Sequence, residues 1–232
     1  MHPDPLIIAL DVESVAEARV LVNVLGLGFY KVGLELYTGS GMDFVRELKN
    51  NGHRVFLDLK LYDIGETVKR AVSQVAKVGV DFLTVHAYPQ VMAAATAGAG
   101  SSGLTILGVT VLTSFDESDL RKMGYSGTVS ELVALRVSHA MEAGIGGMVC
   151  SPREVAAVRA MTGPKATLVT PGVRSAGAAE GDQKRVATPA EALANGADYL
   201  VIGRQVTRAA DPRAELEKIR AELMLKTVHP QH

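Results

Sequence analysis

The sequence predicts an α/β fold in which eight parallel strands close into a single-domain (β/α)8 TIM barrel. Short runs of Val, Ile and Leu recur along the chain, with helical patterns between them and glycines where helices should end. The chain has 232 residues, so eight units average 232/8 = 29 residues, which is economical for this fold but sufficient.

Eight segments are predicted as strands. Most of them are apolar throughout rather than alternating, which is typical of strands that are covered on both faces of a parallel sheet. In chain order they are Leu6–Leu10, Phe29–Val32, Arg54–Leu59, Phe82–His86, Thr105–Leu112, Gly147–Cys150, Thr167–Thr170 and Tyr199–Ile202.

Amphipathic helices are expected between the strands, because apolar residues recur there at spacings of three and four. The predicted helices are Val15–Leu25, Asp43–Asn50, Glu66–Val78, Val129–Ala143, Pro152–Met161 and Pro189–Ala194. Ser14, Ser151-Pro152 and Thr188-Pro189 are start signals, and Gly52, Gly79, Gly144 and Gly196 are end signals. Gly79-Val80-Asp81 and Gly196-Ala197-Asp198 look alike, and each links a helix to a strand.

A doubly wound open sheet is the alternative fold. It would usually carry a glycine-rich phosphate turn after an early strand, whereas Asp11-Val12-Glu13-Ser14 contains no glycine. No linker divides the chain, so residues 1–232 are predicted to be one domain with a frayed tail from about 225 to 232. Two loops are expected, Gly98–Gly103 and Gly172–Arg185, and the second is long and polar enough to close over a ligand.

The charge balance gives no sign of nucleic acid or of an anionic membrane as a partner. The chain carries 24 Lys and Arg against 25 Asp and Glu, for a net charge of −1. One cysteine, Cys150, rules out an internal disulfide and favours a reducing compartment. No apolar run reaches the ~18 residues that a membrane span requires, and the start has no signal-peptide pattern. We therefore expect a cytoplasmic protein.

Charged residues stand where strands are predicted to end, which is the edge of such a barrel that carries its active site. Asp11, Lys31, Asp58 and Lys60 belong to three successive strands, and Asp63 follows closely. Asp58 and Lys60 are two apart, so their side chains should share a face. The four groups could form an alternating network that keeps Lys60 protonated, which suits proton donation better than Schiff-base chemistry. A solvated lysine or a surface ion pair is the plainer alternative.

An anion site is predicted at the ends of the last two strands. Gly203 and Arg204 open a short helix whose backbone N–H groups favour an anion, and Arg174 lies in the preceding strand's loop. The alternative is that Gly203 merely turns the chain while Arg204 is solvated. A metal site is not predicted, because the six histidines do not pair at ligand spacing. His86 is expected to be a hydrogen-bonded barrel residue and Cys150 a buried apolar one.

An ordered set of motifs resembles the orotidine 5'-phosphate decarboxylase family over nearly the whole chain. The matching stretches are Ile8-Ala9-Leu10-Asp11, Tyr30-Lys31-Val32-Gly33, Asp58-Leu59-Lys60-Leu61-Tyr62-Asp63-Ile64, Thr84-Val85-His86-Ala87, Val111-Leu112-Thr113-Ser114, Thr170-Pro171-Gly172-Val173-Arg174, Gly181-Asp182-Gln183 and Val201-Ile202-Gly203-Arg204. Each motif is weak by itself, but their order is specific. The resemblance implies a homodimeric carboxy-lyase of pyrimidine biosynthesis that needs no cofactor and converts orotidine 5'-phosphate to UMP and CO₂.

The resemblance also implies a role for each matching residue. Lys60 would protonate pyrimidine C6, and Asp58 would lie against the departing carboxylate. Asp11 and Lys31 would hold the ribose hydroxyls and complete the charged network, and Thr113 would contact the pyrimidine. The phosphate would be bound by Arg174, Gln183, Gly203 and Arg204, with Gly172–Arg185 as the closing loop. Asp63, Ile64 and Thr67 would reach into the partner subunit's site.

One turn departs from the family pattern. After Asp63-Ile64 the family usually reads Pro-Asn-Thr, whereas this chain has Gly65-Glu66-Thr67. Glycine frees the backbone that proline would fix, and Glu66 at a helix start suits the helix dipole. The detail of the turn is therefore open, although Asp63 and Thr67 are retained.

Two other functions fit parts of the pattern. Keto-gulonate-phosphate decarboxylases and hexulose-phosphate synthases share the Asp-x-Lys-x-x-Asp strand but bind Mg²⁺ through a glutamate on the second strand. That position is Lys31 here, and its charge would repel a metal ion. A barrel that binds a phosphorylated ligand without catalysis is the second alternative, and the complete set of four charged groups argues against it.

Chelation separates the first alternative from the metal-free reaction. EDTA is expected to leave the turnover rate of the purified enzyme unchanged, because an ammonium group stands where a metal ligand would be needed. The measurement is decarboxylase activity before and after dialysis against EDTA. Activity that is lost on chelation and restored by Mg²⁺ would favour the metal-dependent relatives instead.

Overall fold

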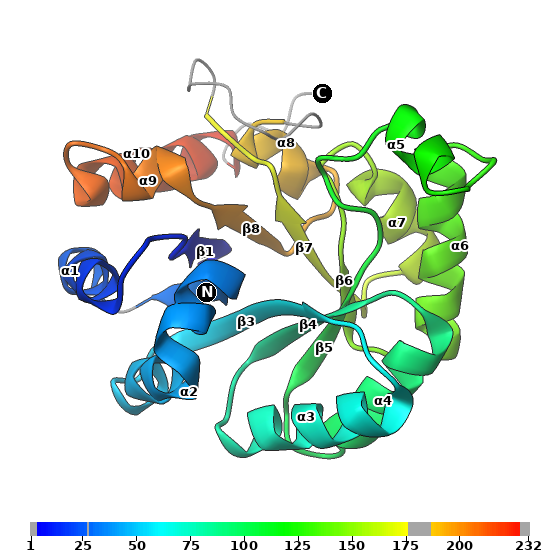
Figure 1. Ribbon diagram of the computed structural model, residues 1–232. Helices are drawn as coiled ribbons and strands as arrows, with labels where there is room; N and C mark the ends of the chain where they lie inside the picture. Colours follow the sequence, from blue (N-terminus) through cyan, green and yellow to red (C-terminus); the bar gives the residue numbers. More distant parts are fainter. Residues whose placement is uncertain (1–3, 27, 176–186, 228–232) are drawn as a thin grey trace.

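The computed structural model describes residues 4–26, 28–175 and 187–227, and these form a closed parallel barrel surrounded by helices (Figure 1). The strands are hydrogen-bonded in sequence order, from β1 to β8 and back to β1. They are β1 (Leu6–Ala9), β2 (Phe29–Gly33), β3 (Arg54–Leu61), β4 (Phe82–His86), β5 (Thr105–Val109), β6 (Gly147–Val149), β7 (Thr167–Pro171) and β8 (Tyr199–Ile202). The predicted fold class is therefore confirmed.

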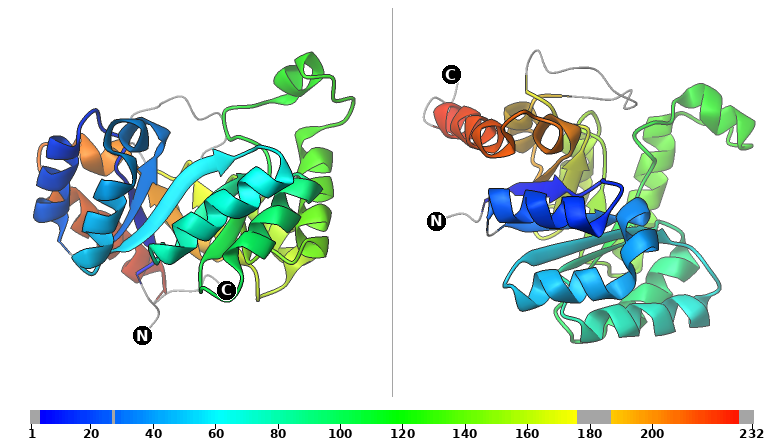
Figure 2. Two further views of the ribbon diagram at one scale, coloured as in Figure 1. Left: turned by 60° about the horizontal axis from the view of Figure 1, so that its bottom comes forward. Right: turned by 60° about the vertical axis from the view of Figure 1, so that its left-hand side comes forward.

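Ten helices lie in the described part of the chain, and most of them pack on the outside of the strands. They are α1 (Val15–Leu25), α2 (Leu34–Asn50), α3 (Gly65–Lys77), α4 (Pro89–Ala99), α5 (Glu117–Lys122), α6 (Val129–Glu142), α7 (Val155–Thr162), α8 (Pro189–Ala194), α9 (Arg204–Thr207) and α10 (Pro212–Thr227). Both views of Figure 2 show α5 projecting beyond the ends of the strands. Of the tail expected to be frayed from about 225 to 232, residues 225–227 belong to α10 and residues 228–232 lie outside the described residues.

Several predicted boundaries were wrong. The strand expected over Thr105–Leu112 ends at Val109, after which Thr110 turns its hydroxyl to the carbonyl of Val149 at 3.0 Å. The helix expected from Asp43 begins at Leu34 and contains a break at Gly41, where φ is 59°. The helix expected from Pro152 starts at Val155, because a turn held by hydrogen bonds from Ser151 to the Glu154 carboxylate comes first.

The predicted Gly98–Gly103 loop was also wrong in part, because α4 continues through Gly98 to Ala99. A Cβ on Gly98 would lie 2.4 Å from the carbonyl oxygen of Lys69 and 3.0 Å from the Cβ of Val72. Both neighbours belong to α3, so this glycine allows the two helices to approach closely. The glycine reflects tight helix packing rather than a flexible loop.

Two hydrophobic clusters fill the barrel, one inside the strands and one between strands and helices. The interior cluster takes one side chain or two from most strands: Ile7, Ala9, Phe29, Phe56, Phe82, Leu107, Val169 and Val201, with Val149 and Tyr199 at its margin. At its base, the Arg54 guanidinium lies 4.0 Å from the centre of the Phe29 ring. The apolar interior leaves the charged residues at the other end.

Two aspartates clamp the base of the barrel at equivalent places. Asp81, before β4, accepts hydrogen bonds from the N–H of Val55 (2.8 Å) and from Lys49 of α2 (2.7 Å). Asp198, before β8, accepts from the N–H of Leu168 (2.7 Å) and from Arg159 of α7 (2.6 Å). The two links that look alike in the sequence, Gly79-Val80-Asp81 and Gly196-Ala197-Asp198, therefore make the same kind of contact. In each, the aspartate joins the start of its own strand to the neighbouring strand and to the helix before that neighbour.

A pair of glycine substitutions tests the close contact between α3 and α4. Gly98→Ala should lower the free energy of unfolding by about 1–3 kcal/mol, because the added methyl overlaps the Lys69 carbonyl and forces the helices apart. Gly39→Ala is the matched control: it is also helical, nothing lies within 4 Å of its Cβ position, and it should be neutral or stabilising by about 0.5–1 kcal/mol. Urea unfolding followed by circular dichroism measures both. Equal effects at the two positions would contradict the packing argument.

Candidate functional site

A cleft of about 930 Å³ opens at the C-terminal ends of the strands, and this is the candidate site. Its volume suits a small-molecule ligand. Apolar walls come from the barrel interior and from the segment after β5, and charged groups come from three directions. The lining comprises Ala9, Asp11, Lys31, Glu35, Phe56, Asp58, Lys60, Val109, Val111, Leu112, Thr113, Val149, Cys150, Pro171, Gly172, Val173, Arg174, Val201, Gly203, Arg204, Gln205, Arg208 and Glu215.

Four charged side chains form a continuous alternating chain along one wall of the cleft. Lys31 Nζ lies 2.8 Å from Asp11 Oδ1 and 3.6 Å from Asp58 Oδ2, and Lys60 Nζ lies 2.8 Å from Asp58 Oδ1. The side chains of Lys31 and Asp58 are 9% and 13% exposed, whereas those of Lys60 and Asp11 are 29% and 51% exposed. The two inner charges are therefore buried, and the two outer ones remain open to a ligand.

Gly33 leaves room for this network. A Cβ at Gly33 would lie 2.9 Å from both Asp11 Oδ1 and Lys31 Nζ, which is closer than real Cβ contacts allow. A side chain at this position would therefore require the end of the Asp11 or Lys31 side chain to shift. Gly33, two residues after the buried Lys31, suits the observed ion pair.

The two-residue spacing predicts that Asp58 and Lys60 meet because they share one face of a regular strand. The structure brings them together in a different way. Between Leu57 and Leu61, four steps along β3 correspond to two steps along β4, so the strand bulges here. Lys60 has φ of 49° and is the one non-glycine residue with positive φ among those the structure describes. This left-handed conformation costs on the order of 1–2 kcal/mol for a residue with a side chain. The bulge turns the ammonium back onto Asp58.

The Asp58 carboxylate stays ionised although it is buried. Burial by itself would raise the pKa of Asp58, but the charges of Lys31 and Lys60, with hydrogen bonds from Lys60 and Thr84, outweigh burial and bring the pKa below its ordinary value of 3.8. Thr84 donates to Asp58 Oδ1 at 2.8 Å. The network thus holds a fixed negative charge next to a cation that faces the cleft.

The opposite end of the cleft is rich in arginine. Arg174 follows β7, and Arg204 is the first residue of α9, directly after Gly203. Arg208 lines the same region. Three of the four residues predicted to bind phosphate, Arg174, Gly203 and Arg204, therefore lie at one end of the cleft. The fourth, Gln183, and most of the predicted loop Gly172–Arg185 lie outside the described residues.

Gln205 fastens the segment that carries Arg174. Its Oε1 accepts the N–H of Ser175 at 3.1 Å, and its Nε2 donates to Glu215 of α10 at 2.8 Å. The Ser175 hydroxyl donates to Glu222, also on α10, at 2.7 Å. These contacts fix the start of the segment after β7 against the last helix.

Asp63, Ile64 and Thr67 do not line the cleft of their own chain. Asp63 is exposed and accepts the N–H of Ile64 at 2.6 Å, and the Ile64 side chain is exposed at 73%. Tyr62 beside them is also 64% exposed. Thr67 lies in the first turn of α3, which begins at Gly65, one residue before the predicted start at Glu66. Two large apolar side chains are thus presented to solvent at the mouth.

Three other residues singled out in the sequence lie at the mouth. Thr113 lines the cleft four residues beyond the end of β5. Cys150 is buried, with 1% of its surface exposed, and also lines the cleft.

His86 ends β4. Burial, followed by the charges of Arg136 and Lys60, lowers the pKa of His86, so its ring is neutral near pH 7. Its ring packs edge-on against Tyr62, with centres 5.8 Å apart.

Some residues of the site were missed by sequence reasoning. Thr84 belongs to one of the motifs that match the family but was given no role, although it stands out as a polar residue inside the apolar strand Phe82–His86. Glu35, Gln205 and Glu215 lie on helices after β2 and β8, Arg208 directly follows α9, and no local pattern separates them from ordinary solvated residues. Their place in the cleft depends on how those helices pack.

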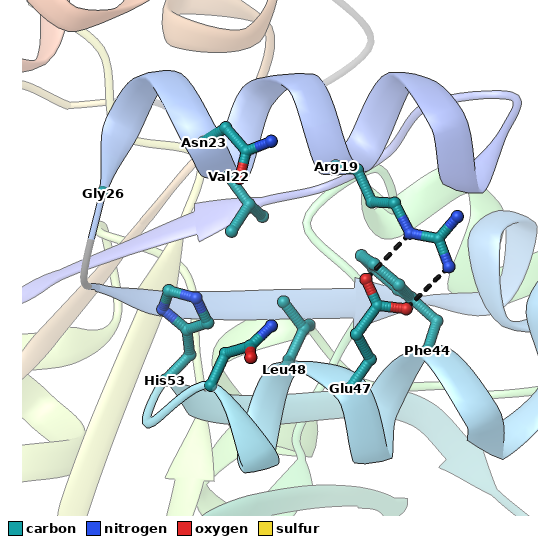
Figure 3. A pocket seen from close by; sticks show the side chains of 9 residues that line it. Arg19, Val22, Asn23, Gly26, Phe44, Glu47, Leu48 and His53 are labelled. Carbon is teal, nitrogen blue, oxygen red and sulfur yellow. Dashed lines mark hydrogen bonds and ion pairs between the residues drawn. The ribbon is translucent and has the colours of Figure 1, made fainter.

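A second hollow of about 510 Å³ lies on the outer wall between α1 and α2 (Figure 3). Figure 3 shows Arg19 and Glu47 facing each other across it, and they form two hydrogen bonds of 2.8 and 2.7 Å. His53 lines the other end, and burial lowers its pKa. Because the charges here already neutralise each other, the barrel mouth remains the candidate site.

Neither a metal-binding cluster nor a membrane span is found in the part of the chain that the structure describes. In residues 4–26, 28–175 and 187–227, no three His, Cys, Asp or Glu side chains are grouped to hold a metal ion. Over the same ranges, every helix is too short or too polar to cross a membrane.

Comparison with known proteins identifies a family. The model of the orotidine 5'-phosphate decarboxylase / HUMPS family matches residues 4–219. The chain is similar to the orotidine 5'-phosphate decarboxylase of Rhodopseudomonas palustris (strain BisB5), with 53% identity over 226 residues that cover 97% of this chain and 96% of that protein. It is also 53% identical to the enzyme of the same name from Bradyrhizobium sp. (strain ORS 278), over 95% of this chain and 91% of the other.

Solved structures agree in fold. The crystal structure of orotidine 5'-phosphate decarboxylase from Lactobacillus acidophilus superposes with a TM-score of 0.84 at 34% identity, covering 95% of this chain and 99% of that one. An uncharacterized conserved protein from Geobacillus kaustophilus gives a TM-score of 0.82 at 39% identity, covering 94% and 100% of the two chains.

Replacing the buried carboxylate should make stability depend less on pH. Because the pKa of Asp58 is depressed in the folded protein, its contribution is present above the unfolded pKa near 4 and is lost as pH falls through the folded value. Asp58→Asn should lower the free energy of unfolding by roughly 2 kcal/mol at pH 7, and the gap should shrink towards pH 3. Urea unfolding across this range measures it. A gap that is constant with pH would contradict the proposed role of the charge.

Proposed function

The chain belongs to the orotidine 5'-phosphate decarboxylase / HUMPS family, and on that premise we propose that it is a carboxy-lyase that converts orotidine 5'-phosphate to UMP and CO₂. The observation that carries the proposal is the alternating chain Asp11–Lys31–Asp58–Lys60 at the barrel mouth. The relatives with which the chain shares about half of its residues bear the name of this activity. The reaction would serve pyrimidine biosynthesis.

Lys60 is the proposed proton donor. When the bond between C6 and the carboxyl carbon breaks, the electron pair remains on C6, where no adjacent group can delocalise it. An ammonium held at that position stabilises the developing charge and then transfers its proton to C6. Lys60 suits this role because its Nζ is fixed by Asp58 at 2.8 Å and its side chain is still partly exposed to the cleft.

Asp58 is proposed to face the departing carboxylate. Two like charges about 4 Å apart near a protein surface repel by about 4 kcal/mol, and this repulsion ends as neutral CO₂ forms. The burial of Asp58 and its lowered pKa support the role, because the carboxylate is already charged before the substrate binds. Asp58 therefore both fixes Lys60 and destabilises the bound carboxylate.

The remaining roles divide between the two ends of the cleft. We assign the ribose hydroxyls to Asp11 and Lys31, because Asp11 is half exposed and can accept hydrogen bonds. Thr113 is assigned to the pyrimidine. The phosphate is assigned to Arg174, Gly203 and Arg204, with Gln183 as a further proposed contact; guanidinium groups bind phosphate oxygens in pairs. Phosphate binding far from C6 can contribute to catalysis by ordering the site.

The homodimer is also a proposal. Asp63, Ile64 and Thr67 do not line the cleft of their own chain, and Ile64 (73%) and Tyr62 (64%) are among the most exposed large hydrophobic residues that the structure describes. A second copy that covers them would receive Asp63 and Thr67 at its own site. The cytoplasmic location stays a prediction.

The assay for this function is the loss of orotate absorbance on incubation with orotidine 5'-phosphate. Wild-type protein should turn the substrate over, and Lys60→Ala should abolish decarboxylation because the proton donor and the fixed cation are both lost. The variant should still fold and bind UMP, which calorimetry measures. Near-normal turnover in Lys60→Ala would refute the donor role, and a wild-type protein that binds UMP without turnover would refute the enzyme assignment.

A further inference from the structure

We propose that Thr84 is a positioning residue for the decarboxylation: its hydroxyl joins the backbone of Lys60 to the carboxylate that holds the Lys60 ammonium. This inference rests on the proposed function of the site. Thr84 lies in β4, faces the barrel interior beside β3 and is fully buried. It does not line the cleft, so it would act through Asp58 and Lys60 rather than on the substrate.

The hydroxyl completes a closed loop of hydrogen bonds. The Lys60 N–H donates to Thr84 Oγ1 at 3.0 Å, and Thr84 Oγ1 donates to Asp58 Oδ1 at 2.8 Å. The same Oδ1 atom accepts from Lys60 Nζ at 2.8 Å. The ammonium of Lys60 is therefore bound directly to one oxygen of Asp58, and its backbone N–H is linked to the same oxygen through the Thr84 hydroxyl.

The backbone of Lys60 needs such a partner. The regular ladder between β3 and β4 is interrupted between Leu57 and Leu61, so no β4 carbonyl pairs with the Lys60 N–H in register. Positive φ at a residue with a side chain persists only when its surroundings fix it. The Thr84 hydroxyl replaces the missing ladder contact and holds the conformation that aims Lys60 into the cleft.

Packing does not require a hydroxyl at this position. Thr84 shares its face of β4 with the interior residue Phe82, and valine has the same branched shape as threonine without the polar atom. Thr170 of β7 provides the contrast: it is also fully buried, yet its Oγ1 has no hydrogen-bond partner. The same substitution at the two threonines therefore separates the hydroxyl contact from packing.

The test compares Thr84→Val, Thr84→Ser and Thr170→Val with the wild type. Thr84→Val should lower kcat for orotidine 5'-phosphate by about tenfold to a hundredfold, since a misplacement of about 1 Å has effects of that size. Its KM and its affinity for UMP should change little, because the phosphate end is untouched. Thr84→Ser restores the hydroxyl and should recover most of kcat, and Thr170→Val should match the wild type.

A pH profile adds a readout that packing alone would not move. Asp58 faces Lys31, Lys60 and Thr84, and the Thr84 hydrogen bond is one of the causes that lower its pKa. The acidic limb of kcat/KM should therefore shift to higher pH in Thr84→Val and return in Thr84→Ser. If the valine methyl prevents folding, Thr84→Ala removes the hydroxyl without overpacking and is compared in the same way.

Three results would overturn the proposal. The first is an unchanged kcat in Thr84→Val or Thr84→Ala, and the second is a serine variant as impaired as the valine variant. Equal loss in Thr84→Val and Thr170→Val would likewise assign the effect to packing. A wild-type protein without decarboxylase activity would instead refute the proposed function, so the two failures are distinguishable.

Discussion

The ionised carboxylate of Asp58 is the constraint on which the mouth of this barrel depends. A buried charge is costly unless ion pairs and hydrogen bonds replace its lost hydration, and Asp58 has both, from Lys31, Lys60 and Thr84. These partners come from three adjacent strands, β2, β3 and β4. The network can therefore form only when those strands are paired in register, so the site depends on the folded sheet.

The charged site depends on one irregularity in the barrel, the bulge of β3 at Lys60. Elsewhere in the interior, apolar residues alternate inward and fill the barrel down to the Arg54–Phe29 contact at its base. Between Leu57 and Leu61 the β3 strand bulges, and the strained residue is Lys60 itself. Strain at one functional residue, held by a rigid apolar barrel, is a common way of keeping a reactive group in place before the substrate arrives.

The sequence predicted the eight strands, their order and the residues that meet at the mouth, because the apolar runs are short and the charges follow them directly. The helix α4 was missed, since its Ala-rich segment has no polar face and its one glycine, Gly98, resembles the start of a loop. The bulge at Lys60 could not be predicted from the sequence, because a regular strand would also place Asp58 and Lys60 on the same face and so gave no reason to expect an irregularity. Thr84 and Gln205 were missed for a different reason: their roles depend on partners from neighbouring elements.

The aspartate clamps at the base repeat four strands apart, at the start of β4 and at the start of β8. A rotation of half a turn about the barrel axis would carry one clamp onto the other, so the foot of the barrel has twofold pseudo-symmetry. The mouth has no such symmetry: the alternating charged chain comes from the end of β1 and from β2 and β3, and the arginines follow β7 and β8. The base of the barrel therefore keeps a twofold repeat in this contact that the candidate site at the mouth does not share.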